Sequence, residues 1–143
     1  MTLEESAPLK NTIGLIGVGL VGTALAERLL KSNHHVVGCD ISPDRQRDLT
    51  SLGGQIVSSP DDVFAATDIV FISLPTSEIT TQVFDAVRSN LTGKTIIDTT
   101  TGDPDQMIAL ERKLAASGAN YLDATIAGSS AQVRAGEVVL MIG

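Results

Sequence analysis

The sequence predicts an α/β protein built on a doubly wound parallel sheet. Short apolar runs typical of strands alternate with helical segments along almost the whole chain, through short connections. The first run, residues 13–16, leads into a glycine-rich turn and then into a helical pattern. The 143 residues contain no internal repeat and no low-complexity linker, which predicts one domain over residues 12–143.

The glycine-rich turn has GxGxxG spacing between a strand and a helix. Gly17 permits a tight turn, Gly19 lacks a Cβ that would keep a pyrophosphate from the backbone, and Gly22 lets the helix approach the strand. The first N–H groups of the helix, and its dipole, would face the phosphates. We interpret the motif as the dinucleotide-binding turn of a Rossmann-type domain; the alternative is a purely structural turn. The predicted cofactor contacts are Gly17, Val18, Gly19, Leu20, Val21 and Gly22.

A carboxylate closes the second expected strand, residues 35–40. Asp40 lies roughly 20 residues beyond the glycines, where it can accept hydrogen bonds from the adenosine ribose. The alternative is a helix cap, but Ser42 and Pro43 already supply a cap and a first-turn proline for the next helix. Asp40 would repel a 2′-phosphate, and the nearest basic residue, Arg45, lies inside that helix. The sequence therefore predicts NAD rather than NADP.

Segments whose residues could contact a ligand follow the ends of several expected strands. In a parallel sheet, ligands bind beyond the carboxyl ends of the strands. The unbroken apolar run 69–74 is typical of a strand buried on both faces. Five segments are expected to meet at one edge of the sheet: residues 17–22, Asp40, Leu74-Pro75, residues 99–101 and residues 125–130.

Helices are expected at residues 43–52, 60–66, 77–89, 104–117 and 131–135, and further strands at residues 55–57, 95–98, 120–124 and 138–142. Two of these helices carry apolar side chains at helical spacing. They are Ile79, Val83 and Val87 in the first, and Met107, Leu110 and Leu114, expected inward, in the second.

Composition excludes several classes of partner. The net charge is −7 and no Lys/Arg cluster offsets it, which argues against a nucleic-acid surface. A phosphate ligand remains compatible, because a helix N-terminus binds phosphate without basic side chains. No apolar run approaches the roughly 20 residues of a membrane span, so no membrane association is expected.

The single cysteine and the two histidines indicate the cellular compartment of the protein and whether it binds a metal. Cys39 is the only cysteine, which excludes an internal disulfide and favours a core thiol in a reducing compartment such as the cytoplasm. His34 and His35 have no metal-ligand spacing to other residues, so we expect them to be exposed and predict no metal. Residues 1–11 lack a basic region and an apolar region, and we expect a flexible leader there rather than a secretion signal.

Four segments together resemble a known family. They are Gly14-Leu15-Ile16-Gly17-Val18-Gly19-Leu20-Val21-Gly22, Leu74-Pro75-Thr76-Ser77, Asp98-Thr99-Thr100-Thr101-Gly102-Asp103-Pro104, and Asp123-Ala124-Thr125-Ile126-Ala127-Gly128-Ser129 with Gly136 and Leu140-Met141-Ile142-Gly143. In order and spacing these resemble the β-hydroxyacid dehydrogenase family, which includes 3-hydroxyisobutyrate dehydrogenase and tartronate semialdehyde reductase. The 6-phosphogluconate dehydrogenases are built on a similar half.

The resemblance implies roles for matching positions. The glycine turn would bind the pyrophosphate and Asp40 the adenosine ribose. Leu74 and Pro75 would line the cofactor, with Thr100 near the nicotinamide. Backbone N–H groups and a hydroxyl would hold the substrate carboxylate, since clustered N–H donors form an anion nest. That substrate turn comprises Ala127, Gly128, Ser129 and Ser130.

The sequence departs from the family pattern at several positions. Ala127 stands where the family usually has a substrate-binding serine, so either Ser129 or Ser130 supplies the hydroxyl or the substrate differs. Thr125 replaces a proline of the motif. Val21 replaces the usual methionine of the glycine turn, and Ile79 stands where some members have a cofactor-contacting asparagine.

The family also carries a catalytic lysine on a second, helical domain. The lysines of this chain lie outside any matching motif, so no catalytic residue is assigned. We therefore expect the NAD-binding half of an oxidoreductase that acts on a small hydroxy acid, inactive by itself and homo-oligomeric as a full-length enzyme. The alternative is a stand-alone dinucleotide-binding or regulatory module. Imine and 6-phosphogluconate substrates stay open within the enzyme class.

Overall fold

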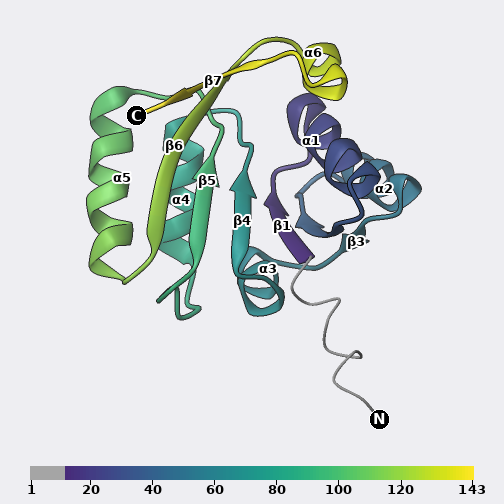
Figure 1. Ribbon diagram of the computed structural model, residues 1–143. Helices are drawn as coiled ribbons and strands as arrows, with labels where there is room; N and C mark the ends of the chain where they lie inside the picture. The colour runs from purple at the N-terminus through teal and green to yellow at the C-terminus, as the bar shows by residue number, and fades with distance from the viewer. Residues whose placement is uncertain (1–11) are drawn as a thin grey trace.

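The computed structural model, which describes residues 12–143, is a seven-stranded sheet with helices around it (Figure 1). The leader expected over residues 1–11 lies outside the described residues. The strands are β1 (Thr12–Ile16), β2 (His35–Cys39), β3 (Gln55–Ile56), β4 (Ile69–Ile72), β5 (Thr95–Asp98), β6 (Asn120–Ala127) and β7 (Val139–Ile142). The helices are α1 (Leu20–Lys31), α2 (Pro43–Leu52), α3 (Pro60–Ala66), α4 (Ser77–Ala86), α5 (Pro104–Ala116) and α6 (Ser130–Ala135).

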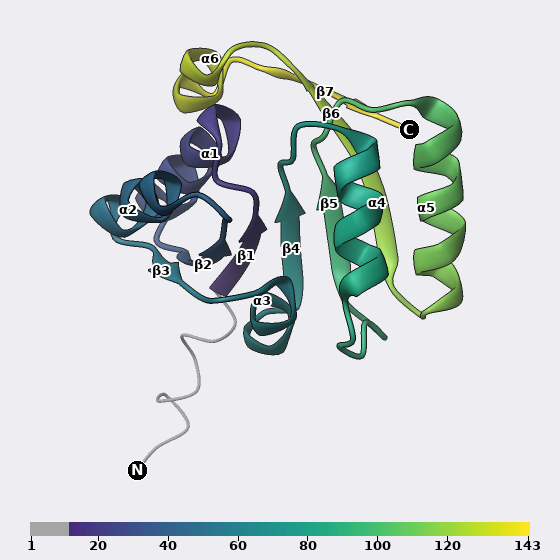
Figure 2. The same cartoon turned by 180° about the vertical axis from the view of Figure 1, so that it is seen from behind.

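The strand order is β3-β2-β1-β4-β5-β6-β7, and every pairing from β3 to β6 is parallel. The chain adds strands outward from β1 to β3, then returns to the other side of β1, where it forms β4 and continues outward to β6. Right-handed crossovers on the two sides of this switch place their helices on opposite faces. The helix α4 lies behind the strands in Figure 1 and in front of them in Figure 2. The predicted doubly wound Rossmann-type fold is confirmed.

The last strand corrects the expectation of a wholly parallel sheet. The strand β7 runs antiparallel to β6, with Ala127 opposite Val139 and Ala124 opposite Ile142. A parallel return would need a crossover to the far end of the sheet, typically of a dozen or more residues. Instead α6 ends at Ala135, the residue that follows it, Gly136, has a left-handed φ of 74°, and the chain turns straight back along β6.

The core lies on both faces of the sheet because neighbouring residues of β1 point to opposite sides. Ile16 packs in one cluster with Phe64 and Ile72, whereas Leu15 packs in the other with Leu49. The expected inward face of α5 is confirmed, since Met107, Leu110 and Leu114 are all buried.

The helix α4 is shorter than expected. Its buried residues are Ser77, Thr80 and Phe84. Of the apolar residues noted at helical spacing, Val83 and Val87 pack partly buried against the core, whereas Ile79 remains 37% exposed. The helix ends at Ala86 instead of continuing to residue 89, because the Asp61 carboxylate accepts hydrogen bonds from the N–H groups of residues 88 and 89. The polar residues face inward because they meet the loop after β5.

The strand β4 is also shorter and more exposed than expected. It ends at Ile72, and Leu74 donates its N–H to a side chain of the next connection rather than to a strand. Val70 and Ile72 are fully buried, but Ile69 is 38% exposed at the start of the strand. Burial on both faces therefore holds only for part of the apolar run.

Candidate functional site

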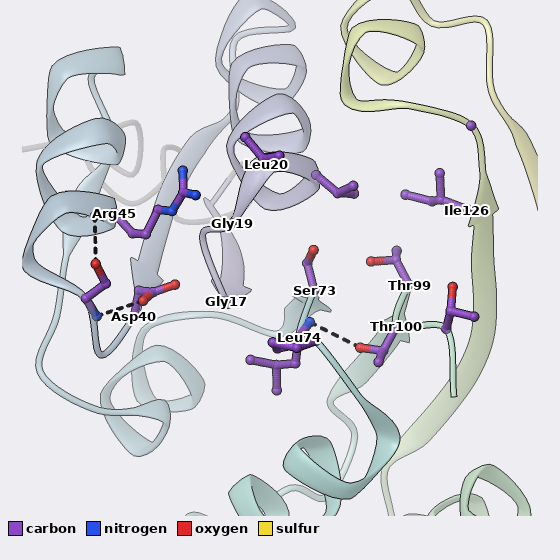
Figure 3. A pocket seen from close by; sticks show the side chains of 15 residues that line it. Gly17, Gly19, Leu20, Asp40, Arg45, Ser73, Leu74, Thr99, Thr100 and Ile126 are labelled. Carbon is purple, nitrogen blue, oxygen red and sulfur yellow. Dashed lines mark hydrogen bonds between the residues drawn. The ribbon is translucent and has the colours of Figure 1, made fainter. Parts of the chain in front are cut away.

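A pocket of about 620 Å³ lies along the carboxyl edge of the sheet (Figure 3). Its walls come from the ends of β1, β2, β4, β5 and β6, so the segments expected at this edge do meet there. Asp40 and Arg45 lie at one end, the glycine turn in the middle, and Thr99, Thr100 and Ile126 at the other end. The lining residues are Gly17, Gly19, Leu20, Val21, Asp40, Ser42, Arg45, Ser73, Leu74, Pro75, Thr99, Thr100, Thr101, Ile126 and Gly128.

The three glycines of the turn do different things. Gly17 has a φ of +93°, and a Cβ there would lie 2.1 Å from the carbonyl oxygen of Ser73. A Cβ on Gly22 would lie 2.3 Å from the carbonyl oxygen of Gly17, so this glycine lets α1 pack against the turn. A Cβ on Gly19 would meet nothing within 4 Å. The outer glycines are therefore needed for packing, and the middle one borders open space in the pocket.

The helix α1 begins at this turn without a side-chain cap. Gly19 is its N-cap, and the first turn contains no acidic residue. Each of the other five described helices has a capping side chain that accepts a backbone N–H: Ser42, Ser59, Thr76, Asp103 and Ser129. The partial positive charge at the start of α1 is thus left for a ligand to satisfy.

The carboxylate of Asp40 is held in place by two backbone groups. Its Oδ2 accepts from the N–H of Val18 at 2.7 Å, and its Oδ1 accepts from the N–H of Ser42 at 2.8 Å. Two carboxylate oxygens have about four acceptor positions, so capacity remains for a ligand hydroxyl. Arg45 lines the same end of the pocket, and its Nη1 lies 3.5 Å from Oδ2 of Asp48.

The other end of the pocket is formed by the connections after β4 and β5. Thr100 is buried, and its Oγ1 accepts a hydrogen bond from the N–H of Leu74 at 3.2 Å, which is drawn in Figure 3. Thr99 donates both its N–H and its hydroxyl to the carbonyl of Ile72. These bonds fix residues 99–101 against the end of β4.

The serine-containing turn reaches the pocket through its glycine. Gly128 has a φ of +153° and lines the pocket. Ser129 forms a capping box with Gln132: its Oγ accepts from the Gln132 N–H at 3.2 Å, and its own N–H donates to Gln132 Oε1 at 2.7 Å. Neither Ser129 nor Ser130 lines the pocket in this arrangement, because both lie on the helix side of the turn.

A second space of about 450 Å³ adjoins the pocket and shares Gly17, Asp40, Leu74 and Pro75 with it. Apolar side chains dominate its remaining wall. They include Ile41, which is fully exposed, together with Ile16, Pro60, Ile79 and Val83. The exposed face of α4 is therefore part of a groove next to the pocket.

Ionisable groups are distributed unevenly along the pocket. Asp40 and Arg45 lie at one end, and none of the described residues that line the other end is titratable. Cys39, the last residue of β2, is buried, and burial raises the pKa of its thiol to about 12, with a smaller effect of the nearby Asp40 charge. Over residues 12–143, no group of three His, Cys, Asp or Glu side chains is arranged to hold a metal ion. In the same range no helix combines the length and apolarity needed to cross a membrane.

Most of the site residues named from the sequence meet in this pocket. Those that line it are Gly17, Gly19, Leu20, Val21, Asp40, Leu74, Pro75, Thr100 and Gly128, whereas Val18, Gly22, Ala127, Ser129 and Ser130 lie behind or beside it. Thr99, Thr101 and Ile126 also line the pocket and belong to segments expected at this edge, although they were given no role of their own. The lining residues that the sequence did not place there are Ser42, Arg45 and Ser73. Ser42 and Ser73 lie within a few residues of the carboxyl end of a strand, which is the signal that could have found them.

Comparison with known proteins gives consistent matches. The family described as the NAD binding domain of 6-phosphogluconate dehydrogenase matches residues 12–143. The mitochondrial 3-hydroxyisobutyrate dehydrogenase of Bos taurus is 31% identical over 144 residues, which cover 98% of this chain and 43% of that protein. This chain therefore spans less than half the length of that relative.

Two solved structures have the same fold over this region. The 3-hydroxyisobutyrate dehydrogenase of Mycobacterium tuberculosis with L-serine has a TM-score of 0.83 and 26% identity, over 93% of this chain and 46% of that chain. The reductive aminase of Aspergillus terreus in complex with NADPH4, cyclohexanone and allyl amine has a TM-score of 0.84 and 25% identity, over 91% of this chain and 46% of that chain.

Proposed function

The chain belongs to the family of the NAD binding domain of 6-phosphogluconate dehydrogenase, and we propose that it binds NAD in the pocket between Asp40 and Gly128. The observation that carries this proposal is the uncapped start of α1, which meets the pocket at Gly19. A helix dipole and backbone N–H groups stabilise a phosphate there. The open space beside Gly19 fits a pyrophosphate that must approach the backbone closely.

The adenosine half of NAD would lie toward β2. Asp40, held by the N–H groups of Val18 and Ser42, would accept hydrogen bonds from the ribose hydroxyls. Its charge disfavours a 2′-phosphate, which supports NAD over NADP. The positive charge of Arg45 would favour a 2′-phosphate, but its guanidinium is paired with Asp48. The apolar groove beside Asp40 suits an adenine ring.

The nicotinamide half would lie toward β4, β5 and the serine-containing turn. Leu74, Pro75 and Thr100 would exclude water from this end, and the turn from Ala127 to Ser130 would bind a substrate carboxylate. Backbone N–H groups of such a turn suit an anion. Ser129 already accepts a hydrogen bond as a cap, but its hydroxyl proton is still available to a carboxylate oxygen.

The whole protein would be an oxidoreductase like 3-hydroxyisobutyrate dehydrogenase, acting on a small hydroxy acid. NAD, when bound, supplies a hydride acceptor. This chain would orient the cofactor and substrate, but no described residue at the nicotinamide end can take the hydroxyl proton. We therefore propose that residues 1–143 alone bind NAD without turnover. The full enzyme would be a homo-oligomer in the cytoplasm, and the buried, unpaired thiol of Cys39 supports a reducing compartment.

The second candidate is a non-catalytic dinucleotide-binding or regulatory module. The same absence of a titratable group at the nicotinamide end, within residues 12–143, favours it. A full-length protein with a lysine facing this end of the pocket would favour the enzyme.

Calorimetric titration of the chain with NAD and NADP tests the binding proposal. We expect saturable binding of NAD and weaker binding of NADP. An assay of NADH formation with a panel of small hydroxy acids, run beside the full-length protein, tests the proposal that residues 1–143 bind NAD without turnover. Robust turnover by the 143-residue chain would contradict it, and the absence of any nucleotide binding would contradict the proposed function itself. Tighter binding of NADP would remove Asp40 from its proposed role.

A further inference from the structure

A buried carboxylate lies directly behind the nicotinamide end of the proposed NAD pocket. Asp98, the last residue of β5, is 0% exposed and does not itself line the pocket. Removing a carboxylate from water is costly unless hydrogen bonds replace the lost hydration. Asp98 has two such bonds, and together they connect β6 to the floor of the pocket.

The first bond comes from β6. The hydroxyl of Tyr121 donates to Asp98 Oδ2 at 2.7 Å. The two residues lie on adjacent strands, where Asp98 is paired in register with Asp123. Tyr121 is partly buried against the core and also contacts the sulfur of Met107. The tyrosine thus holds one carboxylate oxygen from the side away from the pocket.

The second bond points to the pocket. The N–H of Thr100 donates to Asp98 Oδ1 at 2.9 Å, which fixes the turn that follows β5. Thr100 in turn accepts the N–H of Leu74 through its Oγ1, and Thr80 Oγ1 lies 3.5 Å from the same hydroxyl. Both Leu74 and Thr100 line the pocket. A continuous series of hydrogen bonds therefore runs from Tyr121 through Asp98 and Thr100 to Leu74.

We infer that Asp98 and Tyr121 are positioning residues for the nicotinamide half of the dinucleotide. This inference rests on the proposed function. The strand order places β5 and β2 on opposite sides of β1, so residues 99–101 and Asp40 lie at opposite ends of the pocket. The bonds of Asp98 fix the end at β5 and leave the adenosine end, which depends on Val18 and Ser42, unaffected.

Comparing NAD with ADP-ribose isolates this effect, because ADP-ribose lacks only the nicotinamide ring. Tyr121→Phe removes the hydroxyl and keeps the aromatic ring in the core. We expect it to weaken NAD binding by about three- to tenfold, as for the loss of one ordering hydrogen bond, with ADP-ribose affinity unchanged. Asp98→Asn and Thr100→Val should act in the same direction, whereas Thr100→Ser keeps the hydroxyl and should restore the NAD affinity.

Leu114→Ala is the matched control. Leu114 is buried in α5 and has no part in the hydrogen-bond series. Its loss should lower stability while leaving the ratio of NAD to ADP-ribose affinity unchanged. If Tyr121→Phe and Thr100→Val weaken both ligands equally, or leave both unchanged, the inference is overturned and the proposed function stands. If the wild-type chain binds neither ligand, the proposed function fails and the inference with it.

Discussion

The Asp40 carboxylate accepts a hydrogen bond from the N–H of Val18 at 2.7 Å, across 22 residues of sequence. This bond joins the end of β2 to the glycine turn after β1. The same carboxylate accepts the N–H of Ser42 at the start of α2. A residue identified for its expected contact with a ribose therefore also sets the geometry of the phosphate-binding turn.

Replacement of Asp40 should change the choice of dinucleotide. Asp40→Asn keeps an oxygen for the Val18 N–H but removes the charge, and we expect NAD affinity to fall by about ten- to a hundredfold, since hydrogen bonds to charged groups contribute about 1.5–3 kcal/mol. Asp40→Arg should shift preference toward NADP. Calorimetric titration with both dinucleotides measures the ratio. Asp44→Asn is the control, because Asp44 is exposed on α2 and does not line the pocket.

Substitutions of two glycines in the turn should have opposite consequences. Gly19→Val should abolish dinucleotide binding with little change in thermal stability, because the new side chain enters open pocket space and the backbone at Gly19 is already extended. Gly17→Val should prevent folding or destabilise the protein by about 3 kcal/mol or more, from a left-handed φ and a contact with the Ser73 carbonyl. Circular dichroism and titration distinguish the two. Unchanged NAD binding by Gly19→Val would mean that the turn is merely structural.

The thiol of Cys39 should be inert in the folded protein. Burial raises its pKa to about 12, so at pH 8 the reactive thiolate is scarce and inaccessible, and an aromatic disulfide reagent should react only after denaturant is added. The unfolded chain ionises this thiol at lower pH than the folded chain. The free energy of unfolding should therefore fall as the pH rises from about 9 toward 12. Cys39→Ala should show a shallower decline, and an equal slope in both proteins would contradict this assignment.

The strand β7 should limit solubility. Its four residues are apolar and more than half exposed: Val139, Leu140, Met141 and Ile142. An exposed apolar edge strand favours intermolecular pairing. We expect concentration-dependent scattering of light by the chain, reduced by Leu140→Lys. The same change at Ile108, a 46% exposed residue of α5, should have a smaller effect, because a helix surface offers no unpaired strand edge.

The sequence predicted best the features that follow from local chemistry. The glycine turn, the position of Asp40 after β2 and the cap at Ser42 depend on residues close in sequence, and the structure contains each of them. In α4, apolar spacing alone does not identify the buried face, because two polar residues are buried together with Phe84. One of them, Thr80, is buried because it meets Thr100, a contact between distant segments that apolarity cannot reveal.

Features created by tertiary contacts were not accessible from the sequence. The bond from Val18 to Asp40 and the reversed direction of β7 depend on where separate elements meet. Arg45 was noted as a nearby base, but its place on the pocket wall depends on the angle at which α2 leaves β2. Patterns along the chain thus identified which strand ends carry the site, and packing decided which side chains face it.

The docking of α6 on α1 has a consequence for the order in which the protein matures. In both views α6 lies at the end of α1, where Arg134 Nε donates to Glu27 Oε2 at 2.8 Å and the Arg28 guanidinium donates to the carbonyl of Arg134 (Figures 1 and 2). The first of these bonds spans 107 residues. During synthesis the glycine turn leaves the ribosome well before Gly128, so the wall that Gly128 supplies cannot close over it until the chain has emerged as far as α6. Contacts of such long sequence separation form late and slowly, so the nascent chain acquires this pocket only after α6 has been synthesised.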